Sequence, residues 1–243
     1  MQAQSSSAEV RRWLLPALLL LLTCFVPEVA AQTVRPLIAE LGNPAKGRVE
    51  YVNDGLTPLS VVLMAKSFEV SARGEISYRD LDPGIHLKLS NTSFRIQPQQ
   101  SYFVFYEATS GSAPAWFVIY AAFSGFPFRT QQGMNVRLEL PHTVYLLPKQ
   151  SLEKSEVRVV RAEYHRKSKT ALLEVENTGD QFGRVQQTFL ASKKKKQEAP
   201  GFPLFPHSHR ILEVPLDGVD DPDRLILDFQ NFKIEDKVIV SSP

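Results

Sequence analysis

The chain is poor in cysteine. Cys24 is the single cysteine among 243 residues, and it lies inside an apolar N-terminal run. If that run is removed during export, no disulfide can form, although an oxidising compartment would permit one. The sequence also lacks a glycine-rich phosphate loop, a G-x-S-x-G elbow and an H-E-x-x-H motif. We therefore expect a protein that is not an enzyme and needs no cofactor.

The chain also has no large excess of positive or negative side chains. Lysine and arginine exceed aspartate and glutamate by a formal net charge of +2, which does not favour nucleic acid as a partner. The strongest run, Lys193–Lys196, is interpreted either as a solvated hairpin loop or as a contact for anionic lipid or an acidic partner. His207 and His209 share a strand face, but no third ligand lies nearby, so we expect no metal site.

The N-terminus has the pattern of a secretory signal peptide. Arg11 and Arg12 precede the apolar run 13–26, and Val29-Ala30-Ala31 supplies a small-residue cleavage site. The run is short for a membrane span, which needs about 20 residues. We expect export and cleavage after Ala31, which makes 1–31 the signal peptide. Two alternatives remain: an uncleaved anchor helix, and a lipoprotein acylated at Cys24.

Beyond the signal peptide the chain reads as short strands separated by turns. Seventeen prolines and many β-branched and aromatic residues favour this pattern, and no segment has convincing helical amphipathicity. The expected strands are 48–52, 59–64, 68–70, 85–89, 93–96, 102–108, 116–123 and 136–147, and then 157–164, 172–175, 185–190, 211–216, 225–229 and 238–240. Their spacing is typical of β-sandwiches.

Two stretches of local sequence recur in the same order. One strand ends at Asn53, with Gly55 two positions later, and a Pro98 corner precedes a later strand. The second half repeats this with Asn177-Thr178-Gly179 and a Pro206 corner. Glycine tolerates positive φ, and asparagine can bond its own turn backbone. The repetition predicts an all-β fold of two consecutive immunoglobulin-like β-sandwich domains, 32–147 and 152–243, with linker 148–151.

The last strand of the first domain is unusually long and strictly alternating. Its apolar face carries Val136, Leu138, Leu140, His142, Val144 and Leu146, and its other face Arg137, Glu139, Pro141, Thr143 and Tyr145. Pro141 cannot donate a ladder hydrogen bond, which suits an edge or a bulge. Two interpretations stay open: an ordinary core-facing strand, or an edge strand offered to another protein's unfinished sheet.

With these features in place, the chain resembles the periplasmic chaperones of pilus assembly, the PapD-like family. The resemblance covers residues 32–243 and rests on the signal peptide, the strand 48–53, the segment 94–101, the alternating strand 136–146, the proline-containing linker and the segment 173–179. It implies two sandwiches in a boomerang-like arrangement. The last strand of the first domain would then complete the sheet of a pilin subunit.

The resemblance also implies site residues. Val136, Leu138, Leu140, Val144 and Leu146 would contact the subunit. Arg35 would correspond to a basic residue that anchors the subunit's C-terminal carboxylate. A lysine that the family places near the end of the donor strand falls at Tyr145 here, so the basic pair is incomplete.

The leading functional hypothesis is a periplasmic chaperone that binds exported, pilin-like subunits by strand donation, without nucleotide hydrolysis. Its partners would be those subunits and an outer-membrane usher, with no nucleic acid and no small-molecule substrate. Self-association through the donor-strand edge is a further expectation, because an uncovered strand edge invites pairing. The rival hypothesis is a structural or adhesive module of the cell envelope without a client.

Overall fold

The computed structural model describes residues 32–125, 138–193 and 195–241. The predicted signal peptide 1–31 and Val136 lie outside the described residues. Within them, the chain forms strands and one short 3-10 helix, η1 (Lys154–Glu156). No helix in the described part of the chain is long and apolar enough to cross a membrane.

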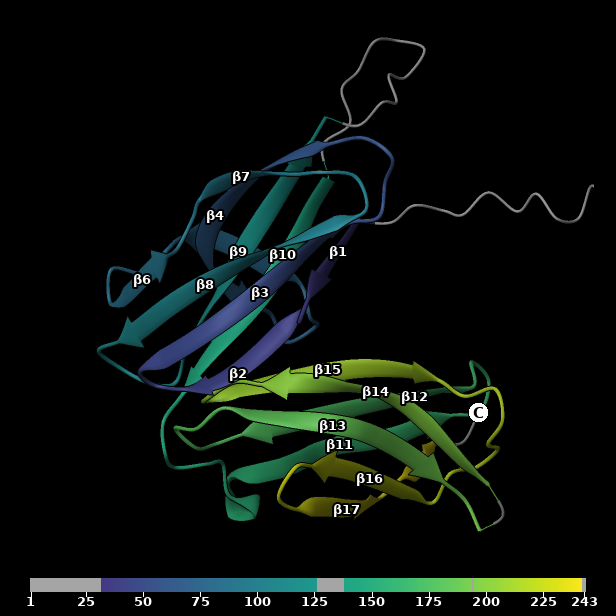
Figure 1. Ribbon diagram of the computed structural model, residues 1–243. Coiled ribbons are helices and arrows are strands. Elements are labelled where there is room, and N and C mark those ends of the chain that lie inside the picture. The colour runs from purple at the N-terminus through teal and green to yellow at the C-terminus, as the bar shows by residue number, and fades with distance from the viewer. Residues whose placement is uncertain (1–31, 126–137, 194, 242–243) are drawn as a thin grey trace, which may run out of the picture.

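The first body is a sandwich of two sheets (Figure 1). One sheet has the strand order β1-β3-β8-β6, and the other has the order β2-β10-β9-β4-β5, with β7 paired to β4. The strands are β1 (Gln32–Arg35), β2 (Ile38–Gly42), β3 (Ala45–Asn53), β4 (Leu59–Val70), β5 (Ile76–Asp80), β6 (Ile85–Leu89), β7 (Ser93–Ile96), β8 (Gln100–Ser110), β9 (Ala115–Ser124) and β10 (Leu138–Leu147).

The second body is also a sandwich, with sheet orders β15-β12-β11-β18 and β14-β13-β16-β17. Its strands are β11 (Val157–His165), β12 (Thr170–Asn177), β13 (Gly183–Ala191), β14 (Lys196–Leu204), β15 (Ser208–Pro215), β16 (Arg224–Phe229), β17 (Lys233–Lys237) and β18 (Ile239–Ser241). Its strands run in a different direction from those of the first body, so the two sandwiches meet at an angle (Figure 1). The prediction of an all-β chain with two sandwiches is confirmed.

Each sandwich buries its own core. In the first, Val49, Val104, Phe117 and Phe123 are fully buried between the sheets, and in the second the same is true of Leu173, Val185, Leu190, Leu204 and Leu225. Alternating strand residues supply these side chains because successive side chains of a strand point to opposite faces. A third apolar cluster, which we call the interdomain cluster, joins the bodies and consists of Phe68, Val118, Tyr145, Phe182 and Phe205.

Several strands differ from the sequence-based expectation. The segments 59–64 and 68–70 belong to one continuous strand, β4. The sequence pattern did not indicate β5, whose five residues are all exposed and therefore show no apolar alternation. It also missed β14, which contains Pro200 and Pro203 and lies at a sheet edge, where missing N–H donors are tolerated.

Candidate functional site

In the ladders that the structure describes, the β10 edge opposite β9 is paired along only the second half of the strand. β10 pairs with β9 in antiparallel orientation from Leu138 to Leu146. On its other side β2 pairs in parallel orientation, beginning at Thr143 and ending at Leu147. The Thr143 N–H donates to the Leu37 carbonyl at 2.8 Å, at the start of this second ladder. In the described ladders, residues Leu138–His142 therefore have β9 as their partner strand, and we call this stretch the open segment.

The alternating face of β10 points into the first domain's own core. Leu138 and Leu140 are half-buried and pack against that core from its rim. Val144 and Leu146 are 0% exposed members of it. The subunit-binding role of Val144 and Leu146 stays a prediction; in this structure their side chains are buried inside the domain, and β2 covers the adjoining edge. Leu138 and Leu140, which belong to the open segment, keep accessible surface.

Arg35 is the last residue of β1, on the sheet opposite β10. It is exposed and lies across from Glu50 in the β1–β3 ladder. After Arg35 the chain crosses through Pro36 and Leu37 to begin β2 in the other sheet. Arg35 therefore lies at the crossover that leads into β2, whose ladder with β10 starts at Thr143, directly after the open segment. It is not among the residues that line the cavity described below.

Tyr145, on the outer face of β10, forms the centre of the contact between the domains. It is 4% exposed, and its ring stacks on Phe182 with 4.5 Å between centroids. Phe205 packs against Trp116 at 4.6 Å and against Phe68 at 6.4 Å. Burial raises the pKa of Tyr145, an effect that the neighbouring Arg184 partly opposes. At the position where the family resemblance implies a lysine, the Tyr145 ring thus packs against the second domain.

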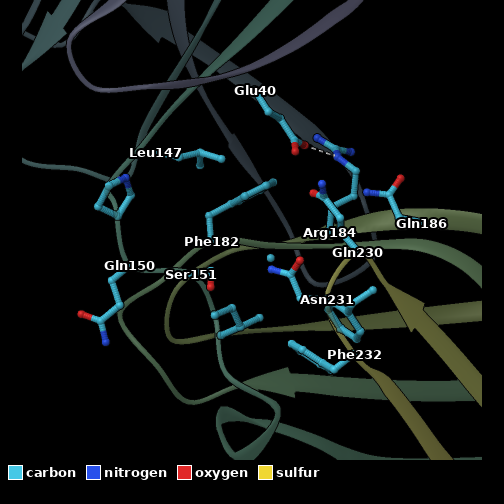
Figure 2. A pocket seen from close by; sticks show the side chains of 14 residues that line it. Glu40, Leu147, Gln150, Ser151, Phe182, Arg184, Gln186, Gln230, Asn231 and Phe232 are labelled. Carbon is cyan, nitrogen blue, oxygen red and sulfur yellow. Dashed lines mark hydrogen bonds and ion pairs between the residues drawn. The ribbon is translucent and has the colours of Figure 1, made fainter.

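Arg184 of β13 supplies a cation at the same place. Its Cζ lies 5.0 Å from the centroid of the Tyr145 ring, and its Nε donates to Oε1 of Glu40 in β2 (Figure 2). Burial lowers the pKa of Arg184, but the bonds to Glu40 and Tyr145 outweigh it, so the pKa is raised overall. Its Nη2 is buried and has no hydrogen-bond partner among the described residues. Arg184 therefore retains donor capacity beyond its ion pair.

Arg210 of β15 is the second cation of the contact. It is 9% exposed, and its Nη1 donates to the carbonyls of Ser71 at 2.7 Å and Ala72 at 3.2 Å in the β4–β5 turn. The guanidinium lies against Gly74, where an added Cβ would come within 2.8 Å of Nη2. Burial lowers the pKa of Arg210, and its buried Nε has no partner within the described part of the chain.

The two arginines line one cavity of about 280 Å³ between the domains. Apolar side chains of the first domain form the facing wall, including Phe68, Ile76 and Tyr78. Pro141 and Thr143, at the junction of the open and covered halves of β10, belong to the same wall. We call this cavity the interdomain cleft. A ligand with an apolar part and an anionic part could contact the apolar wall and the arginines of this cleft at the same time.

The alternation along 136–147 indicated the strand β10, but no pattern in the sequence indicated the cleft. Arg184 follows Phe182 and Gly183 at the start of a strand, and Arg210 sits inside one, with no motif around either. Only the packing of the domains brings them together, so no local pattern could have indicated them. His207 and His209 form no metal cluster with other residues that the structure describes, and His207 Nε2 lies 2.7 Å from Oδ1 of Asp180.

Several solved structures share this fold at low sequence identity. The Class 5 fimbriae chaperone CfaA superimposes with a TM-score of 0.54 at 10% identity, covering 86% of this chain and 99% of that one. A chain in the structure of Salmonella enterica SafA pilin in complex with the SafB chaperone gives 0.55 at 11%, covering 87% and 98%. The E. coli chaperone DraB gives 0.53 at 15%, covering 86% and 98%. No protein-family model and no curated protein matches the chain.

These similarities extend over both domains, so the resemblance inferred from the sequence is confirmed at the level of the fold. The chain has the two-sandwich fold of the periplasmic pilus chaperones.

Proposed function

We propose that this chain, with the fold of the pilus chaperones, is a periplasmic chaperone that binds and stabilises exported, pilin-like subunits by β-strand donation. The observation that carries the proposal is the half-covered edge of β10: the strand is fixed by β2 from Thr143 onward, and Leu138–His142 pair on one side only in the described ladders. An outer-membrane usher is the expected second partner. Binding proceeds without nucleotide hydrolysis.

Main-chain hydrogen bonds and side-chain pockets have separate roles in this mechanism. An added strand gains general affinity from the backbone, and alternate side chains fix its register. Leu138 and Leu140 stand at the rim of the sandwich, half-buried, where an incoming sheet would cover their remaining surface. We therefore propose Leu138 and Leu140 as the main subunit contacts of β10. Val136, which precedes them, lies outside the described residues.

Two sites compete for the role of carboxylate anchor. Arg35, at the crossover between β1 and β2, is the residue that the family resemblance implies. Arg184 and Arg210 line the interdomain cleft, and each has a buried nitrogen without a partner among the described residues. Glu40 balances the charge of Arg184, so Arg210 is the more available cation for a chain end that enters the cleft.

Binding of a client tests strand donation. The tagged mature chain is isolated from periplasm with its bound subunits, and the double variant L138D/L140D is compared with it. A carboxylate placed against an apolar groove is unpaired, at a cost of several kcal/mol, so we expect loss of the client. The matched control is E139Q, on the opposite face of the same strand, which should keep the client.

Leu138 and Leu140 also touch the domain's own core, so folding must be measured alongside binding. Circular dichroism and thermal unfolding of each variant separate the two effects, and the milder L138S/L140S variant serves if the aspartates unfold the domain. A folded variant that retains its client would show that binding takes place elsewhere. In that case the rival hypothesis, an envelope module without strand donation, would be preferred.

The anchor is tested with the same client segment carrying either a free C-terminal carboxylate or an amide. The free acid should bind more tightly to the unaltered chain. If R35A removes this preference, Arg35 is the anchor. If R35A keeps it and R210M removes it, the cleft is the anchor. Equal binding of acid and amide to the unaltered chain would reject both assignments.

A further inference from the structure

The sheet formed by β1, β3, β8 and β6 has one face in the core of the first domain and one face toward solvent (Figure 1). On β8, Val104 and Tyr106 point inward and are buried. Phe103 and Phe105 alternate with them and are 43% and 57% exposed. The two rings are neighbours on the outward face, because residues i and i+2 of a strand point the same way. Two exposed rings side by side make an apolar patch, unlike single apolar residues scattered over a surface.

Lysine and arginine side chains surround this apolar patch. In the ladders Arg48 of β3 lies across from Phe105. Glu50 of β3 lies between Arg35 of β1 and Phe103 of β8. Residues paired across a ladder project from the same face of the sheet, so all of these side chains share the outward surface. We call this surface the outer sheet face; it consists of the two rings and the cations Arg35, Lys46, Arg48 and Lys88.

The positive charge of the outer sheet face is only partly neutralised. Nζ of Lys46 lies 2.8 Å from Oε1 of Glu107, which pairs one cation with one acid. Cζ of Arg48 lies 5.5 Å from the centroid of the Phe103 ring, so this guanidinium is held over the apolar patch. Three cations of the face form no ion pair among the residues that the structure describes: Arg35, Arg48 and Lys88.

Charge and size together decide which partner suits the outer sheet face. It carries four of the ten lysines and arginines of 32–147 but only two of the nine acidic residues, so it attracts anionic partners. Strands about 4.8 Å apart and residues about 3.4 Å apart make it roughly 15 Å wide and 20 Å long. A stable protein interface covers about 800 Å² on each partner, more than twice that area. A weak contact with a bilayer needs only a few cations and apolar groups, so this face fits a membrane surface better than a protein.

The outer sheet face lies apart from the other contacts of the first domain. The second domain packs against the opposite sheet, through the interdomain cluster. The open segment of β10 belongs to that opposite sheet as well. A partner on the outer sheet face would therefore leave both the second domain and the proposed client edge in place.

We propose that the outer sheet face docks on an anionic lipid bilayer. The cations approach the lipid phosphates, and the two phenylalanine rings enter the headgroup region between them. The contact is weak and reversible, because the cations are few and salt screens each of them beyond about 8 Å at physiological ionic strength. The inference rests on the proposed function only for its purpose, which is to hold a chaperone where exported subunits emerge from a membrane.

Flotation of the free, full-length mature chain with lipid vesicles tests the docking without any client. The probe is vesicles of phosphatidylcholine with about one third phosphatidylglycerol, compared with vesicles of phosphatidylcholine alone. We expect binding to the anionic vesicles at about 0.01 M salt and release at about 1 M, because the Debye length falls from about 30 Å to about 3 Å.

Two double variants separate the charges from the rings. R48E/K88E should weaken binding by at least about 25-fold, because each cation near an anionic surface contributes about fivefold. F103S/F105S should weaken it by at least about tenfold, because the rings no longer leave water. The matched control is K193E/K195E, which makes the same change in net charge at exposed lysines of the second domain and should weaken binding less than R48E/K88E. Circular dichroism checks that each variant is folded, and F103A/F105A replaces the serine variant if that one is not.

Absence of binding to the anionic vesicles at low salt would overturn the proposal, as would equal binding to the neutral vesicles. If K193E/K195E weakens binding more than R48E/K88E does, the lysine run contacts the membrane and the outer sheet face does not. A folded F103S/F105S variant that binds fully would reject insertion of the rings. If poly-L-glutamate binds the chain while vesicles do not, the partner is an acidic protein and not a bilayer. Because no client is used, failure here is distinguishable from failure of the strand-donation experiment.

Discussion

Asn53 and Asn177 make the same hydrogen bonds at equivalent places in the two domains. The Asn53 side-chain amide donates to the carbonyls of Thr57, Ile96 and Gln97, and its Oδ1 accepts from the Gly55 N–H. The Asn177 amide donates to Gln181, Leu204 and Phe205, and its Oδ1 accepts from Gly179. Each asparagine, 0% exposed, joins the end of one strand to the proline corner before another.

Replacing either asparagine with aspartate should destabilise its own domain. A carboxylate cannot donate, so the carbonyls lose their partner and a charge is buried beside their oxygens. We expect the free energy of unfolding to fall by at least about 3 kcal/mol for N53D or N177D. Chemical denaturation measures the change.

The controls are N53A and N231D. The first leaves the carbonyls unbonded without adding a charge, so it should cost less than N53D. The second makes the same chemical change at an exposed asparagine and should cost little. Equal stability of N53D and the unaltered chain would mean that these bonds do not hold the corner in place.

The interdomain cluster should couple the two sandwiches. Phe205 is 6% exposed and contacts aromatic rings from both domains. F205A should therefore cost about 3–5 kcal/mol, and part of that loss should appear as separate melting of the domains in calorimetry. F105A, at a side chain that is 57% exposed, is the matched control. If F205A still unfolds in a single transition, with both domains losing stability together, the coupling lies instead in the Arg184 and Arg210 contacts.

The asparagines show how far the sequence could predict this fold. Their turns and the two proline corners are each formed by residues that are neighbours in the sequence, and their repetition indicated two sandwich domains of the same kind. What the residues could not indicate is that each asparagine binds its own corner, because that contact spans 43 residues for Asn53 and Ile96. The sequence showed an asparagine turn and a proline corner in the same order in both halves, but it did not show that the asparagine is hydrogen-bonded to the corner.

The candidate site was predictable to a similar extent. Alternation along β10 is a local property, and it correctly placed Leu138, Leu140, Val144 and Leu146 on one face. Which of them stay accessible depends on where β2 joins the edge and where the sandwich ends. Those are tertiary facts, as is the meeting of Arg184 and Arg210 in the cleft, so period-two reasoning alone could not separate donor residues from core residues.

Export is expected to end with cleavage after Ala31. Intact mass of the exported protein measures it, and the mature chain should begin at Gln32. Such a chain has no cysteine, so its melting temperature should not change with reductant. A chain that begins at an acylated Cys24 would instead establish the lipoprotein alternative.

Gly47 provides a test of the packing beneath His142. It lies across from Tyr106 in the β3–β8 ladder, and the tyrosine ring covers it: an added Cβ would sit 2.3 Å from Cζ and 2.4 Å from the hydroxyl oxygen. G47A must displace this ring, because such distances are far below van der Waals contact. Overpacking of this kind costs about 1–3 kcal/mol. The displaced hydroxyl would also leave Nε2 of His142. The Thr143 N–H, which donates to Leu37 next to the Pro36 carbonyl that the ring contacts, should then lose protection in hydrogen exchange at pH 7.5. G42A is the matched control, because no atom lies within 4 Å of an added Cβ at Gly42, and it should change neither stability nor exchange by much. If G47A is destabilised while Thr143 keeps its protection at pH 7.5, the Tyr106 hydroxyl is not what holds the histidine in place, and the ring must depend on Pro36 alone.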